Sequence, residues 1–145
     1  MREILFKAKR KDNGKWVEGY YCKLDETTYC ISEDYERHPV PTHHYILYET
    51  MTDWGLPNRF LQFEIDHDTL CQYTGLTDVN GKKIWENDIV HCGTKLRVSW
   101  HHFKASWVLS KKGWLYNHFF GEAVEPEDVE VVGNVFDNPD LLEVE

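Results

Sequence analysis

At 145 residues, the chain is long enough to form one domain or two small ones. Hydrophobic residues make up 41% of the sequence and aromatic residues 14%, a composition that supports a packed core, argues against disorder and favours β-strands. Acidic residues outnumber basic residues 25 to 16, and the resulting net charge of −9 argues against binding to bare DNA, to RNA or to an anionic membrane surface.

The sequence predicts no contact with a membrane and no secretion. No run of apolar residues approaches the ~20 that a transmembrane helix needs, and residues 1–4 do not open the apolar stretch of a signal peptide. We therefore expect a cytoplasmic protein with reduced cysteine thiols, packed mostly as small hydrophobic side chains. These cysteines are Cys22, Cys30, Cys71 and Cys92.

The first 64 residues have the pattern of short strands separated by turns. Residues 3–22 predict a β-hairpin, because Asn13 and Gly14 supply the positive φ angles of a tight turn between two strand-like runs. Further along, we expect a third short strand at 27–32, a loop at 33–44, and strands at 45–49 and 60–64.

From residue 65 the strand pattern is more regular. A strong turn signal at 77–82 follows a short strand at 70–73. Further strands are expected at 89–92, 95–100, 105–109, 113–120 and 129–136, and a helical turn that begins at Pro139. Several short strands at close spacing are typical of a small barrel.

Three blocks of sequence, taken together, resemble the YopX family, which is found in phages and prophages. They are residues 2–20 (REILFKA, then GKWVEGY), residues 72–90 (QYTGLTDVNGKKIWENDIV) and residues 131–142 (VVGNVFDNPDLL). The resemblance implies a mostly-β protein with an N-terminal β region (residues 1–64) and a C-terminal SH3-like small barrel (residues 65–145). Asn87 stands where the family usually has glycine, and we expect the turn to survive because asparagine tolerates left-handed backbone angles.

The resemblance implies no biochemical activity and no catalytic residues. The most distinctive block supplies the candidate binding residues, which are Gln72, Tyr73, Thr74, Asn80, Lys82, Trp85, Glu86 and Asp88. A purely structural interpretation competes with this one, since glycines, aspartates and asparagines in turns usually serve backbone geometry.

Metal-dependent and nucleophilic chemistry are both disfavoured by the spacing of the relevant residues. Paired zinc ligands such as Cys-x2-Cys are missing, and His43 and His44 are neighbours that a strand would point to opposite faces. An HNH-like nuclease remains a remote alternative through Asp66, His67, Asn80 or Asn87 and His91, but residues 88–92 have a strand pattern where that motif needs a helix. No Gly-x-Ser-x-Gly motif occurs. We expect no enzyme, no metal and no cofactor.

The leading hypothesis is a phage- or prophage-type accessory protein that acts through protein–protein contacts. The aromatic stretch 107–120, with Trp114 and Tyr116 as candidate contacts, is too rich in rings for a small barrel to bury, so a protein partner or a homo-oligomer is plausible. The alternative is a nucleic-acid-binding barrel, which would need lysines at 7–11, 82–83 and 111–112 to share one face. An acidic mimic of DNA is a third possibility, suggested by the net charge alone.

Overall fold

The computed structural model describes residues 1–115 and 117–143 and is mostly β, with antiparallel strands, as the sequence predicts. The chain divides into two compact units. One is formed by Leu5–Leu70, and the other by Met1–Ile4 together with the chain from Cys71 onward. The sequence places the division after residue 64, whereas the contacts of the chain place it after Leu70.

The unit formed by Leu5–Leu70 is built on strands in the order β4-β3-β2-β1, with each neighbouring pair antiparallel. The elements are β1 (Phe6–Lys9), β2 (Trp16–Asp25), α1 (Ser32–Arg37), β3 (Thr42–Thr50), β4 (Arg59–Glu64) and the 3-10 turn η1 (His67–Thr69). The strands predicted at 45–49 and 60–64 are therefore confirmed.

The predicted N-terminal hairpin is present, with Phe6 opposite Gly19 and Lys9 opposite Trp16. Its turn has the expected chemistry. Gly14 has a φ of 68°, and the Asn13 side-chain oxygen accepts a hydrogen bond from the Lys15 amide at 2.9 Å. This part of the fold is local, which explains why the sequence predicts it.

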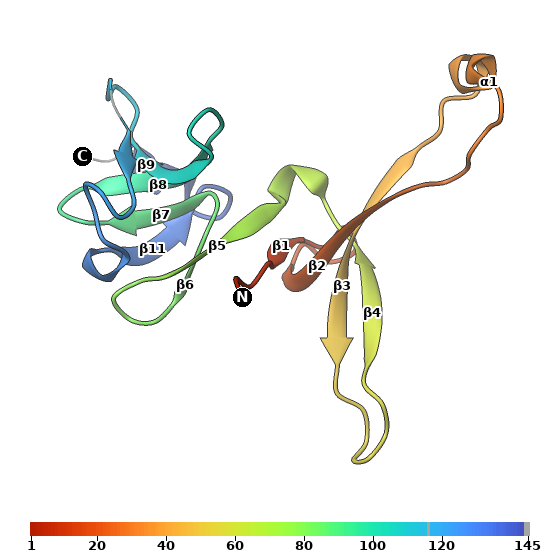
Figure 1. The fold of residues 1–145 in the computed structure, drawn as a ribbon, viewed down its shortest axis with the longest axis horizontal. Coiled ribbons are helices and arrows are strands. Elements are labelled where there is room, and N and C mark those ends of the chain that lie inside the picture. The colour runs from red at the N-terminus through yellow and green to blue at the C-terminus, as the bar shows by residue number, and fades with distance from the viewer. Residues whose placement is uncertain (116, 144–145) are drawn as a thin grey trace. The chain divides into compact units, whose positions relative to one another are not determined.

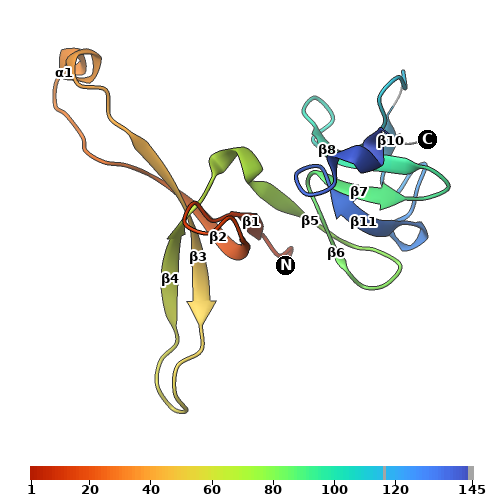
Figure 2. The ribbon, with the colours of Figure 1, turned by 180° about the vertical axis from the view of Figure 1, so that it is seen from behind.

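Between β2 and β3 the sequence-based prediction is wrong. Residues 27–31 form no strand, and the short helix α1 lies in the segment expected to be a loop, at the far end of the long β2–β3 ribbon (Figures 1 and 2). Acidic Glu33 and Asp34 in its first turn and Arg37 in its last complement the helix dipole. At only six residues, the helix is too short to show a periodic pattern.

This unit has a small core made by residues from four separate segments. Ala8, Val17, Ile46 and Ile65 are buried together, and Phe6, Tyr21, Phe63 and Leu70 pack against them. Because the core side chains come from strands far apart in sequence, the pairing of β2 with β3 is essential to the unit.

The second unit contains the hairpin of β5 and β6 and a sheet in the order β10-β9-β8-β7-β11. Its strands are β5 (Cys71–Thr77), β6 (Lys83–Trp85), β7 (Asp88–His91), β8 (Lys95–His101), β9 (Ser106–Ser110), β10 (His118–Phe119) and β11 (Glu130–Asn134). Two 3-10 turns complete it, η2 (Pro126–Asp128) and η3 (Pro139–Leu142), and η3 is the helical turn predicted at Pro139.

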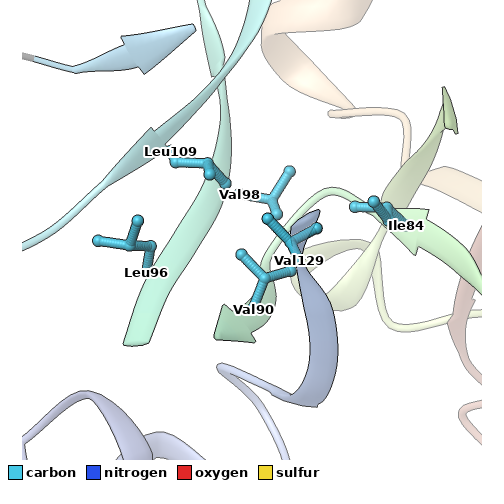
Figure 3. Close-up of a cluster of buried hydrophobic side chains, with 6 residues drawn as sticks. All are labelled: Ile84, Val90, Leu96, Val98, Leu109 and Val129. Carbon is cyan, nitrogen blue, oxygen red and sulfur yellow. The ribbon is translucent and has the colours of Figure 1, made fainter. Parts of the chain in front are cut away.

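Side chains from several strands meet in one core in this unit (Figure 3). The buried residues of this core are Ile84, Val90, Leu96, Val98, Leu109 and Val129. The long strand predicted at 113–120 is wrong, since among the described residues of this segment only His118 and Phe119 are in a strand. The SH3-like character of this unit stays a prediction. Within the described residues, no helix is long and apolar enough to cross a membrane.

Candidate functional site

The candidate residues of the most distinctive sequence block lie on β5, β6, β7 and the turns between them. Tyr73, Thr74, Trp85 and Asp88 are buried, Gln72 and Glu86 are half-buried, and Asn80 and Lys82 are exposed. The structure therefore brings these residues into one part of the second unit, but only some of them reach its surface.

The buried aromatic residues of this block hold the β5–β6 hairpin together. Tyr73 lies opposite Trp85, with 5.4 Å between the ring centroids, and the Lys83 ammonium lies 5.7 Å from the centre of the Tyr73 ring. The Thr74 hydroxyl donates to the Ile84 carbonyl at 2.7 Å and accepts from the Leu76 amide at 3.1 Å. These contacts are those of a packed core rather than of an open site.

The sharp corner between β6 and β7 is built from its own polar side chains. The Asp88 carboxylate accepts a hydrogen bond from the Trp85 amide at 2.8 Å. Asn87 has a φ of 68°, which confirms that asparagine adopts the left-handed conformation required there. Its side-chain oxygen also accepts a hydrogen bond at 2.6 Å from Arg97 on β8.

The pKa of the Glu86 carboxyl, at this corner, lies above its usual value. Burial is the largest cause, and it is partly opposed by the Gln72 amide, which donates to the carboxylate at 3.3 Å, and by the charge of Arg97. Gln72 and Glu86 are also joined through their main chains at 2.9 Å. A half-buried carboxyl held in this way braces β5 against the corner.

Asp78, which the sequence does not single out, is the centre of the turn. One carboxylate oxygen accepts from the amides of Asn80 and Lys82, both at 2.9 Å, and the other accepts from the Val131 amide at 3.0 Å. Burial raises the pKa of Asp78, but these three donors outweigh it, so the pKa lies below its usual value. Asp78 therefore ties the hairpin turn to β11.

Exposed aromatic and apolar side chains gather in the segment from β8 to β10. Trp100 is 45% exposed, packed 5.0 Å from the half-buried Trp107, while Trp114 is 39% exposed and lies 4.7 Å from the His118 ring. Phe103, in the β8–β9 turn, is 92% exposed. We call Trp100, Phe103 and Trp114 the β8–β10 aromatics. The candidate Tyr116 lies outside the described residues.

The first unit contains a group of interacting ionisable side chains that the sequence does not predict. His43 on β3 lies between two carboxylates, with Nδ1 2.8 Å from Glu64 and Nε2 2.7 Å from Glu26. The hydrogen bonds to Glu64 and then to Glu26 raise the pKa of His43. The hydrogen bond from His43, followed by that from Lys11, lowers the pKa of Glu64.

His44 faces the opposite side of the strand and has different partners. Its Nδ1 lies 2.6 Å from the Tyr21 hydroxyl, and its ring stacks on His67 with 4.1 Å between centroids. Burial, then the charge of His67, lowers the pKa of His44. The two adjacent histidines thus point in opposite directions, as expected for neighbours on a strand.

The contribution of His43 to stability should depend on pH. A raised histidine pKa stabilises the fold fully below its ordinary value of 6.5 and ceases to do so as pH rises through the folded pKa. The lowered pKa of Glu64 adds stability that is lost as pH falls below its ordinary value of 4.5. The difference in urea midpoint between wild type and His43→Gln should therefore be largest between these values and shrink toward alkaline pH. His102→Gln, at an exposed histidine, is the control, and a difference that grows toward alkaline pH would contradict this account.

The nuclease alternative needs a helix at residues 88–92, and the structure has strand β7 there. His91 ends strand β7 and Asp66 accepts a hydrogen bond from the Asp68 amide at the start of η1. Among residues 1–115 and 117–143, no group of three or more His, Cys, Asp or Glu side chains is arranged to hold a metal ion.

Comparison with known proteins gives a family and a fold. A family model described as YopX protein matches residues 5–143. The crystal structure of protein EF1440 from Enterococcus faecalis is similar to this chain, with a TM-score of 0.53 and 14% sequence identity over 98% of this chain and 99% of that chain. At this identity the likeness concerns the fold alone. The search among curated proteins found no match.

Proposed function

The chain belongs to the YopX family, and starting from that membership we propose that it is a phage- or prophage-type accessory protein that binds another protein and catalyses no reaction. The association with phages follows from the three sequence blocks that resemble the family. We place its action in the cytoplasm, where the four free cysteines would stay reduced.

The exposure of the β8–β10 aromatics is the observation that carries the proposal. Tryptophan and phenylalanine bury large areas with few rotatable bonds, so they anchor protein interfaces. Trp100 and Trp114 have rings held in place by Trp107 and His118, which lowers the entropy lost when a partner covers them.

The polar residues of the Gln72–Asp88 block support binding over catalysis. Thr74 and Asp88 are buried and hydrogen-bonded to main-chain groups, and Asp78 accepts three main-chain amides. Side chains occupied in this way shape the turn and present Asn80 and Lys82 on the surface.

Replacing Trp114 should strongly reduce the capture of a protein partner. Tagged wild type, Trp114→Ala and Val132→Ala would be used to isolate partners from bacterial lysate, with and without nuclease, and the bound proteins quantified by mass spectrometry. Val132 is the matched control, since it has the same 39% exposure in the same unit. We expect a nuclease-resistant partner whose recovery falls about tenfold or more with Trp114→Ala, as for an interface hot spot.

Two results would contradict this proposal. If Trp114→Ala and Trp100→Ala each recovered as much partner as wild type, the β8–β10 aromatics would not be part of the interface. Capture that disappears with nuclease would favour the nucleic-acid alternative, which the excess of acidic over basic residues disfavours.

A further inference from the structure

Strand β4 has an open edge whose hydrogen-bonding groups can be assigned. The Ile65 amide donates to the His44 carbonyl at 3.0 Å, and β4 and β3 pair without a register shift from Glu64 to Arg59. In an antiparallel pair, residues alternate between pointing their main-chain groups at the partner strand and away from it. Phe60, Gln62 and Glu64 therefore point theirs away from β3.

A second contact confirms this assignment and limits the open edge. The Lys11 amide donates to the Glu64 carbonyl at 3.0 Å from the side away from β3, so Glu64 is already occupied. No such partner is found among the described residues for the main-chain groups of Phe60 and Gln62, and both residues are exposed. The open edge is the stretch from Arg59 to Phe63.

This edge lacks the features that usually protect a sheet edge. β4 has no proline, no bulge and no charge between its end residues Arg59 and Glu64. In the sheet of the other unit, one outer strand, β10, has two residues, and the other, β11, has a register shift between Val131 and Gly133. β4 is also apolar, with Phe60 56% and Leu61 39% exposed.

We propose that β4 pairs antiparallel with β4 of a second copy of this chain. A two-fold axis perpendicular to the sheet keeps each face on its own side. The register that matches Phe60 with the second copy's Gln62 is the one that pairs the free main-chain groups of both residues in both copies. Each such pair exchanges two N–H···O bonds. A register centred on Gln62 would need the Glu64 carbonyl, which Lys11 already occupies.

The side chains fit the same register. Leu61 meets its own copy on the axis, on the face where Tyr48, Leu61 and Phe63 line a groove of about 460 Å³. Phe60 meets an uncharged glutamine, so no like charges face each other across the axis. At each end of the pairing, Arg59 of one copy faces Phe63 of the other, next in sequence to the other copy's Glu64.

The surroundings of the edge leave room for the second strand. Lys11, Asp12, Gln62, Phe63 and Glu64 line a hollow of about 310 Å³ next to β4. In this register, Arg59 of the second copy lies at the end of β4 where Lys11 closes the edge. The second copy's strand begins at Arg59, so the loop before it can turn away from the sheet at that end. Both positive charges at that end are paired. The Lys11 ammonium lies against Glu64, and the Arg10 guanidinium lies against Asp12.

A short strand pair should give a dimer that depends on concentration. Sedimentation velocity of the full chain from about 1 µM to about 500 µM should show a monomer–dimer equilibrium. Leu61→Lys places two like charges on the axis and should shift the midpoint at least about tenfold toward monomer. Leu24→Lys, at an exposed leucine of β2, is the matched control and should leave the equilibrium unchanged.

Disulfide cross-linking tests the register directly. In a Cys30→Ser background, which removes the exposed native thiol, Leu61→Cys should form a covalent dimer under mild oxidation, because facing residues of a non-hydrogen-bonded antiparallel pair lie ~4.5 Å apart at Cα. Arg59→Cys faces Phe63 instead and should not. A wild type that stays monomeric at the highest concentration, a dimer unaffected by Leu61→Lys, or a dimer without the Leu61→Cys cross-link would each overturn the proposal.

Discussion

Replacing Gly19 with alanine should destabilise the unit formed by Leu5–Leu70 by about 3 kcal/mol or more. A Cβ at this position would overlap the Leu47 carbonyl oxygen and lie 3.0 Å from Cγ2 of Ile46. The overlapping atom belongs to the main chain of β3, so no side-chain rotation relieves the clash. The methyl group would push β3 away at the position where its pairing with β2 begins, and Ile46 belongs to the core of this unit.

Urea unfolding of Gly19→Ala, followed by hydrogen exchange of peptides from residues 5–70, measures this effect. The exchange data assign the loss to the correct unit, because peptides from residues 71–143 should keep their protection. Glu18→Ala is the control, an exposed residue on the same strand whose change should stay within about 0.5 kcal/mol. An unchanged midpoint for Gly19→Ala would mean that β2 and β3 do not approach so closely.

The parts of the fold that the sequence predicts are those set by neighbouring residues. Asn13-Gly14 fixes the first hairpin through a positive φ and a side-chain hydrogen bond two residues away. Asn87 keeps its left-handed angle for the same local reason. The alternation of apolar and polar residues in β4 is also a local pattern, and Phe63 is the residue of this strand that packs against the core.

The parts that escape the sequence depend on residues far apart in the chain. The Val131 amide that binds Asp78 lies 53 positions away, and His43 meets its two carboxylates at separations of 17 and 21. No spacing rule connects such residues before the strands are placed. The mistaken strand at 113–120 has a different cause, since Trp114, a residue type that favours strands, is exposed there outside any strand.

The same reasoning explains why only some of the candidate site residues reach the surface. A distinctive block of sequence is equally compatible with a required turn and with a binding surface. Here Tyr73, Trp85 and Asp88 are used inside the unit, and the exposed members are Asn80 and Lys82 at the turn between β5 and β6. The exposure of the β8–β10 aromatics is fixed by the packing of the whole unit, which the sequence pattern does not contain.

Asp78→Ala should destabilise the second unit by about 3 kcal/mol, because three main-chain amides lose their acceptor at once. Two of these amides shape the turn and the third belongs to β11, so the variant loosens both. Asp78→Asn is the graded control. Its remaining oxygen keeps part of the bonding, but its NH2 group faces a donor, and a loss of roughly 1–2 kcal/mol is expected.

The pH dependence separates the charge of Asp78 from its shape. A carboxyl with a lowered pKa stabilises the fold above its ordinary value of 3.8 and loses that contribution as pH falls through the folded pKa. Asparagine does not titrate, so the gap in unfolding free energy between wild type and Asp78→Asn should be constant near neutral pH and narrow on acidification below about pH 4. A gap that stays constant to about pH 2.5 would mean that the ionised carboxylate adds nothing beyond its geometry, and that the amides of Asn80, Lys82 and Val131 need only a neutral acceptor.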